Sequence, residues 1–325
     1  MLSRVADSLF WLGRYTERAE NYARFIDVNN NLALDLPPGV KEQWRPIITA
    51  TGDDFLFNQR NQKATREHAL HFLAFDDQNP NSILNSVSMA RENARQIRES
   101  ISIEIWEVLN ELYHYMKACV KKKIWLKEHA ECYKRMRNQL QLMGGIAYDT
   151  APRMQGWYFM QTGQYLERAD KTSRILDVKY HILLPSVDSV GTPIDFLHWN
   201  ALLKSVSGFN TYRRLYGKLN PTYIVEYLVL SKTFPRSILF CLQAAETCLH
   251  EISSSKGGFS NPAEKEIGML RSELEFAEVN DIFNRGLHEY LDQLQMRINK
   301  ISDAIYRQYF EIRSSFAENS QQQST

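Results

Sequence analysis

Apolar residues recur at spacings of three and four along nearly the whole chain, which is the period of an amphipathic α-helix. Alternating runs of β-branched residues joined by Asn-Gly turns, the pattern typical of strands, do not occur in the sequence. The pattern therefore predicts an all-α protein of roughly ten helices. The longest helix is expected from about Val279 to Arg313, where leucines and isoleucines keep one apolar stripe.

Capping signals locate the starts of four helices. A side chain that can accept a hydrogen bond from the first turn precedes each of them, and three also carry proline at the first helical position. These signals are Asn81-Ser82, Thr192-Pro193, Asn220-Pro221 and Asn261-Pro262. Helix breaks are expected at residues 36–39, at Gly144 and Gly145, at residues 184–191 and at residues 253–258.

Two segments of the chain are copies of one another. Residues 13–28 and 163–178 are identical at eight of 16 positions, and two further blocks match in the same order. Trp44 and Gly52 match Trp199 and Gly208, and residues 80–84 match residues 235–239. We therefore expect a tandem duplication that builds a pseudo-symmetric helical bundle. Its parts are a first helical repeat over residues 1–150, a second over 151–314 and a disordered tail over 315–325, and the repeats could form one compact domain.

Charged side chains share one face of the repeated helix. In the first copy they are Glu17, Glu20, Arg24 and Asp27, with Gly13, and in the second copy Glu167, Asp170, Arg174 and Asp177, with Gly163. The opposite, apolar face differs more between the copies than this charged face does. A solvated face should change faster than the core that it covers. The charged face is therefore expected to be buried in both copies, with the glycines allowing close backbone approach.

Three interpretations of this face remain open. It could be a buried network of glutamate and arginine that joins helices. It could be a polar cleft at a pseudo-two-fold axis, where Arg24 and Arg174 hold an anionic ligand or the acidic tail of a partner. It could also be a solvated face. The candidate ligand- or partner-binding residues are Arg14, Glu17, Arg18, Glu20, Arg24, Glu167, Arg168, Asp170 and Arg174.

Metal and cofactor signatures are weak. Carboxylate di-iron bundles need two Glu-x-x-His motifs, and only Glu111 to His114 has that form. The repeated glutamates also have arginines beside them, which would compete for their charge. Motifs for nucleotide phosphates, dinucleotides, a serine nucleophile or a zinc protease do not occur. We expect no metal and no cofactor, and no specific enzymatic reaction can be assigned.

Composition narrows the choice of partner and compartment. Lys plus Arg number 39 and Asp plus Glu 38, so no excess of positive charge favours nucleic acid. The four cysteines include no Cys-x-x-Cys pair and are expected to be reduced core residues. Arg4 and Asp7 interrupt the N-terminal apolar stretch, and no apolar run reaches the roughly 20 residues of a membrane helix. We expect a cytoplasmic protein that does not enter a membrane.

Several motifs resemble those of the Alpha-E family, a bacterial all-helical family named for its Glu-Arg motif. They are Trp11-Leu-Gly-Arg-Tyr-Thr-Glu-Arg-Ala-Glu20, Tyr165-Leu-Glu-Arg-Ala-Asp170, residues 1–4, 199–203, 208–214 and 234–237. The resemblance covers essentially the whole chain. On the family motif the matching residues are Glu17, Arg18, Glu167 and Arg168. The second copy departs from the first at Gln164, which stands where the first has Arg14.

The resemblance implies a function only indirectly, because the family has no established activity. Its members are typically encoded beside, or fused to, circularly permuted ATP-grasp proteins and transglutaminase-like proteins. That context implies a helical accessory protein that works with an ATP-grasp ligase in peptide or amide-bond metabolism and is not catalytic alone. The alternatives are an enzyme that uses Glu17 and Glu167 as acid and base in a cleft between the halves, and a self-associating scaffold.

Overall fold

A computed structural model describes residues 1–37, 43–60, 63–127, 129–182, 192–255 and 258–311. Within these ranges all regular structure is helical, which confirms the all-α prediction. The first part holds α1 (Ser3–Asp35), α2 (Arg45–Thr51), α3 (Asp54–Arg60), α4 (Arg66–Ala74), α5 (Ile83–Gln96), η1 (Arg98–Ser100), α6 (Ile103–Lys121), α7 (Ile124–Lys127) and α8 (His129–Thr150). The second holds α9 (Gln155–Ile182), α10 (Pro193–Ser205), α11 (Phe209–Tyr216), α12 (Pro221–Leu230), α13 (Ile238–Ser253), α14 (Pro262–Glu275), α15 (Val279–Arg285), α16 (Leu287–Ile305) and η3 (Tyr306–Phe310).

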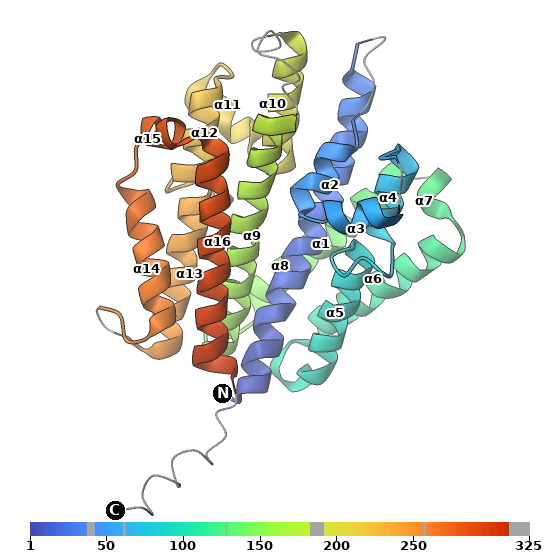
Figure 1. Ribbon diagram of the computed structural model, residues 1–325. Coiled ribbons are helices and arrows are strands. Elements are labelled where there is room, and N and C mark those ends of the chain that lie inside the picture. Colours follow the sequence, from blue (N-terminus) through green and yellow to red (C-terminus); the bar gives the residue numbers. More distant parts are fainter. Residues whose placement is uncertain (38–42, 61–62, 128, 183–191, 256–257, 312–325) are drawn as a thin grey trace, which may run out of the picture.

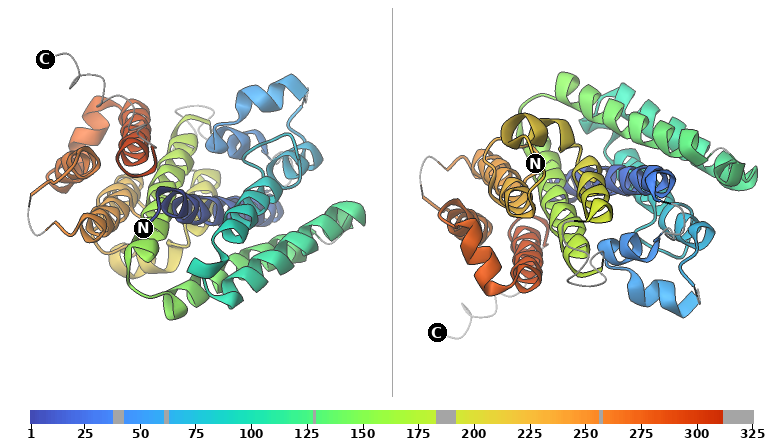
Figure 2. Two further views of the ribbon diagram at one scale, coloured as in Figure 1. Left: turned by 90° about the horizontal axis from the view of Figure 1, so that it is seen from below. Right: turned by 90° about the horizontal axis from the view of Figure 1, so that it is seen from above.

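Two long helices, α1 and α9, lie side by side at the centre of the molecule (Figure 1). Seen end-on, α2 to α8 lie on one side of this pair and α11 to α16 on the other (Figure 2). Helix α1 also packs against α5 and α8, and α9 packs against α13 and α16. Because other helices surround this central pair, its polar side chains are removed from solvent along with its apolar ones.

Matching segments make reciprocal contacts around the central pair. Helix α2, which follows Trp44, packs against α9, and α10, which contains Trp199, packs against α1. Helices α5 and α13 likewise occupy corresponding places beside α1 and α9. These contacts are what a pseudo-symmetric arrangement would give. The duplication itself, with its boundaries at residues 150 and 314, stays a prediction.

Three predictions about the number and the bounds of the helices were wrong. The described residues hold α1 to α16 rather than roughly ten helices, because several short helices such as α3 and α7 lie between the long ones. Helix α8 runs straight through Gly144 and Gly145, because Met143 and Ala147 on either side of them are buried in the core. The long helix expected from Val279 is split at Gly286, whose φ of 87° is incompatible with a right-handed helix.

All four capping signals are confirmed. Ser82, Thr192, Asn220 and Asn261 accept backbone hydrogen bonds at the starts of α5, α10, α12 and α14. The breaks expected at residues 36–39 and 253–258 fall partly outside the described residues. Those expected at residues 184–191, and the tail over 315–325, lie wholly outside them.

The core is continuous through both parts of the chain. All four cysteines are buried and free, as expected, with the sulfurs of Cys119 and Cys132 3.3 Å apart. None of the helices in the described ranges is both long and apolar enough to cross a membrane.

Candidate functional site

The backbones of α1 and α9 approach closely at the repeated glycines, each of which lies against a backbone carbonyl of the other helix. A Cβ atom on Gly13 would lie 2.1 Å from the carbonyl oxygen of Met160, and one on Gly163 would lie 2.1 Å from that of Phe10. Both distances are far below a van der Waals contact, so only glycine permits this approach. The close backbone approach predicted at these glycines is confirmed, and it brings the Glu-Arg dipeptide of each helix onto the other.

Glu17 is fully buried and is held by the opposite helix. Its carboxylate accepts a two-pronged interaction from Arg168, with Nε at 3.0 Å and Nη2 at 2.8 Å. Nη1 of Arg236 donates from 2.8 Å, and the side-chain amides of Asn21 and Gln164 donate from 3.0 and 3.2 Å. Every lone-pair direction of this carboxylate is therefore served by a donor.

Glu167 is the counterpart of Glu17 and is also fully buried. Arg18 reaches it from α1 with Nε at 2.6 Å and Nη2 at 3.0 Å. Nε of Arg14 adds a third bond at 2.9 Å, and the ammonium group of Lys171 lies 3.5 Å away. Each Glu-Arg motif therefore gives its carboxylate to the other helix and receives a guanidinium in return.

The pairing holds both carboxylates in the ionised form. Burial alone would raise the pKa of Glu17, but Arg168, Arg236 and Arg24 lower it well below its usual range. The pKa of Glu167 is lowered in the same way, against burial, by Arg18, Lys171 and Arg14. A general acid at neutral pH needs a raised pKa, so neither carboxylate suits that part of the alternative enzymatic interpretation.

Glu20 and Arg24 extend the network on one side of the crossing. Arg24 is 2% exposed and forms an ion pair with Glu20 one turn before it. Glu20 also receives Nη2 of Arg236 at 3.1 Å and the amide of Gln141 at 3.0 Å. Burial, and the repulsion of Arg236, lower the pKa of Arg24 to about 10. Arg24 is therefore an enclosed structural group rather than a residue presented to a ligand.

Asp170 and Arg174 extend the network on the other side and are more open. Nε of Arg174 donates to Asp170 from 2.9 Å, and Nζ of Lys171 lies 3.0 Å from the same carboxylate. The side chain of Arg174 keeps 24% of its surface exposed. Arg24 and Arg174 match in sequence, but only Arg174 reaches a free surface.

That free surface is a cavity of about 240 Å³ between α1, α9 and the segment joining α2 to α3. Its charged lining consists of Arg14, Arg18, Lys171, Arg174, Asp53 and Asp170. Asn81 forms part of the wall, accepting from Nη1 of Arg18 at 2.8 Å and donating to Asp53 at 2.8 Å.

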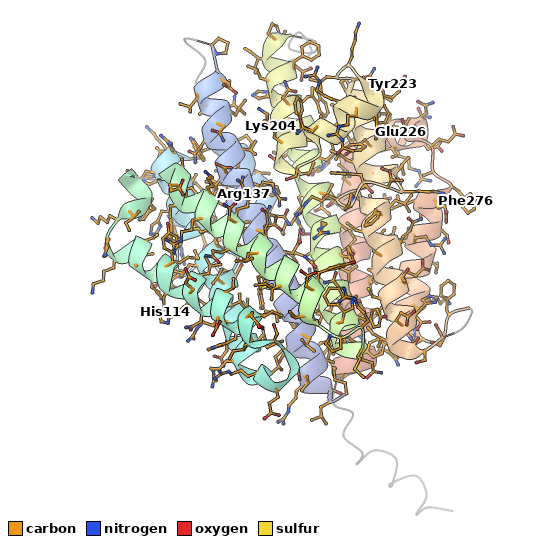
Figure 3. The ribbon with its side chains drawn as sticks, turned by 180° about the vertical axis from the view of Figure 1, so that it is seen from behind. His114, Arg137, Lys204, Tyr223, Glu226 and Phe276 are labelled. Atoms are coloured by element: carbon orange, nitrogen blue, oxygen red, sulfur yellow. The ribbon has the colours of Figure 1, made fainter. Side chains whose placement is uncertain are left out.

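The charged face ends in two further pairs. Asp27 is bound at 2.5 Å by Arg137, which Figure 3 shows on α8 where that helix passes over α1. Asp177 lies 2.8 Å from Nδ1 of His288 on α16. Both pairs link the central helices to the elements that pack on them.

The structure decides between most of the open interpretations of the charged face. Of its candidate residues, Arg14, Glu17, Glu20, Arg24, Glu167 and Asp170 are buried, and Arg18, Arg168 and Arg174 are partly buried. The solvated interpretation is therefore wrong, and a buried Glu/Arg network is present. A ligand cleft stays a prediction, and among the described residues the cavity beside Arg174 is where it could lie.

Sequence analysis missed four residues of the site: Arg236, Asn81, Lys171 and Asp53. Asn81 and Arg236 occupy the one position that differs within the matched blocks around Pro80 and Pro235. A single difference within an otherwise identical block of five was the available signal. Nothing in the sequence marks Asp53, which joins the site only through packing.

No group of three or more His, Cys, Asp or Glu side chains suited to a metal occurs within the described ranges. His114 lies exposed on α6 at the periphery (Figure 3), and its neighbour Glu111 pairs with Arg135 at 3.0 Å.

Comparison with known proteins agrees with the helical fold and the Glu-Arg pairs. The model of the Alpha-E family, described as a predicted alpha-helical domain with a conserved ER motif, matches residues 1–310. An uncharacterized protein of Mycobacterium bovis and one of Mycobacterium tuberculosis are each 23% identical over 313 residues, which is 90% of this chain and 34% of the relative. The chain thus spans about a third of the length of these relatives. No solved structure matches it.

The chain contains the dipeptide Glu-Arg at residues 17–18 and again at 167–168, and these two dipeptides exchange ion pairs across the central helix crossing. The match covers all of the described chain but its last residue, and the chain belongs to the Alpha-E family.

Proposed function

We propose that this chain is a helical binding protein of the cytoplasm that works beside a circularly permuted ATP-grasp ligase. In this role it holds part of a peptide-like substrate while the ligase forms the amide bond. The ligase comes from the family resemblance, in which such proteins are encoded beside or fused to one another. A binding role, rather than a catalytic one, comes from the geometry of the site.

One observation carries the proposal: the motif carboxylates are fully occupied, whereas cations beside them face a cavity. Glu17 and Glu167 are bound by two arginines each and stay ionised, so they have no proton to give and no open side. Arg174 and Lys171 line the cavity instead. Such a surface can attract and orient an anionic group.

The size of the relatives is consistent with a partner. About two thirds of each mycobacterial relative lies outside the matched segment. That arrangement is expected if the helical unit works next to other protein segments, either in one chain or in a complex.

Affinity purification of the tagged chain at native expression, followed by mass spectrometry, tests the partnership. We expect stoichiometric recovery of an ATP-grasp protein. The recovered complex would then be assayed for ATP-dependent amide-bond formation, with the free ligase for comparison. Arg174→Gln should lower the activity of the complex, whereas Arg95→Gln, an exposed arginine on α5, should not. Recovery of the chain alone at its own mass would contradict the partnership.

A further inference from the structure

We propose that the cavity beside Arg174 binds one small oxyanion, a phosphate or carboxylate group, per chain. The proposal concerns the isolated chain and does not depend on a ligase partner. It rests on the charges around the cavity, on unused hydrogen-bond donors, and on a difference between the two sides of the helix crossing.

Positive charge is in excess around the cavity. Four cations, Arg14, Arg18, Lys171 and Arg174, line it. In the described part of the chain, three carboxylates lie beside them: Asp53 and Asp170 in the wall, and Glu167, which is paired with Arg14 and Arg18. Since these groups are withdrawn from bulk water, the excess charge is poorly screened, and an anion entering the cavity would be stabilised.

Donors suited to an oxyanion face this space. Arg174 donates to Asp170 through its Nε alone, and its two terminal nitrogens bond to no acceptor in the described part of the chain. A guanidinium presents these nitrogens as a planar fork that matches two oxygens of a carboxylate or phosphate. Lys171, one helical turn away, also lines the cavity, and its ammonium group is paired with Asp170 at 3.0 Å.

The opposite side of the crossing shows how such a space is closed. There Arg236, which matches Asn81 in sequence, extends into the network and donates to the carboxylates of Glu17 and Glu20. Its Nη1 also donates to the amide oxygen of Asn21 at 3.1 Å. On the cavity side the shorter Asn81 stops at Arg18 and Asp53. Asn21 matches Lys171 in sequence. The cavity side therefore has a cation where the opposite side has a neutral amide, and the short Asn81 where the opposite side has the long Arg236.

The dimensions limit the ligand to a small polar group. A cavity of about 240 Å³ exceeds the roughly 30 Å³ of one water molecule several-fold. It is below the roughly 300 Å³ at which pockets for drug-sized ligands begin. Its lining offers charged and polar groups rather than an apolar surface. One oxyanion with a short polar attachment fits this description.

Isothermal titration calorimetry of the full chain at low ionic strength tests the proposal, with inorganic phosphate as one probe and succinate as the other. We expect one probe or both to bind with one site per chain, and binding to weaken as sodium chloride is added. Binding of phosphate alone identifies a phosphoryl ligand, and binding of succinate alone identifies a carboxylate ligand.

Two variants assign the site, and one serves as the control. Arg174→Gln should weaken binding by at least about tenfold, because it removes a charge-assisted pair while Asp170 keeps Lys171. Asn81→Arg should abolish binding by filling the cavity as Arg236 fills the other side. Arg95→Gln should bind like the unmodified chain.

Binding of neither probe would overturn the proposal. So would affinities that stay unchanged in both Arg174→Gln and Asn81→Arg with folded proteins. Circular dichroism establishes folding for each variant. If Asn81→Arg does not fold, Arg174→Gln alone decides, because its side chain is partly exposed and its removal leaves no carboxylate unpaired.

Discussion

Gly13 and Gly163 each lie against a backbone carbonyl of the opposite central helix, and replacing either glycine with alanine should destabilise the fold. The added Cβ would lie 2.1 Å from a carbonyl oxygen of the other helix, whereas ordinary contacts begin at 3.4 Å. The helices would have to separate by about 1.3 Å, the difference between these two distances. The obstacle is backbone rather than a flexible side chain, so no rotamer change can relieve it.

The expected loss follows from three contributions. Overpacking a core costs about 1 to 3 kcal/mol, and a rigid backbone neighbour places this site at the upper end. Separation of the helices would also lengthen the ion pairs between Glu17 and Arg168 and between Glu167 and Arg18, which are close to their shortest distances. Against this, alanine favours a helix over glycine by roughly 1 kcal/mol. We therefore expect each variant to lose at least about 2 kcal/mol in the free energy of unfolding.

The same chain provides a matched control in α8. Gly144 and Gly145 also lie within a helix, but an added Cβ meets nothing within 4 Å at either position. Gly144→Ala and Gly145→Ala should each gain roughly 0.5 to 1 kcal/mol, because only the helix preference changes. Urea denaturation followed by circular dichroism measures all four variants. If Gly13→Ala and Gly163→Ala were stabilised like the α8 variants, the close crossing of α1 and α9 would be refuted.

Three other predictions concern the charged network. Arg24→Ala should lower the free energy of unfolding, measured by urea denaturation, by about 2 to 4 kcal/mol, because it empties an enclosed site. Arg174→Ala should lower it by less than about 1 kcal/mol. Equal losses would contradict the different burial of the two arginines. The lowered pKa values of Glu17 and Glu167 should stabilise the fold at pH values above their unfolded value, 4.5, and this stability should be lost as the pH falls below it. A urea midpoint that stays constant from pH 6 to pH 3 would argue against ionised carboxylates in the network. Glu167→Gln should cost about 3 to 5 kcal/mol because Arg14 and Arg18 would lose their shared anion, and a loss below 1 kcal/mol in the same assay would show that the pairing contributes little.

Sequence reasoning worked best where structure is set locally. The all-α class follows from the apolar period, and Ser82, Thr192, Asn220 and Asn261 cap helices as predicted because capping depends on a few adjacent residues. Burial of the charged face could also be inferred, because its residues changed less between the copies than the apolar ones did.

Predictions failed where tertiary context overrides local preference. Gly144 and Gly145 predicted a break, but packing on either side of them holds α8 in one piece. The cavity was not predictable, because Asp53, Asn81 and Lys171 come from segments far apart in the chain and meet only when α2 packs against α9. Equal roles for Arg24 and Arg174 were assumed from their matching positions. Arg236 helps to enclose Arg24, whereas Arg174 stays partly exposed.

Reciprocal pairing of the two Glu-Arg motifs is the central claim, and a double-mutant cycle on Glu17 and Arg168 tests it most directly. The free energy of unfolding would be measured for the unmodified chain, Glu17→Gln, Arg168→Gln and the double variant. We predict a coupling of at least about 1 kcal/mol across the helix crossing, as found for contacting buried groups. The exposed pair of Glu92 and Arg95 on α5 supplies the reference cycle. A coupling between Glu17 and Arg168 no larger than in that reference would contradict a network that holds α1 to α9.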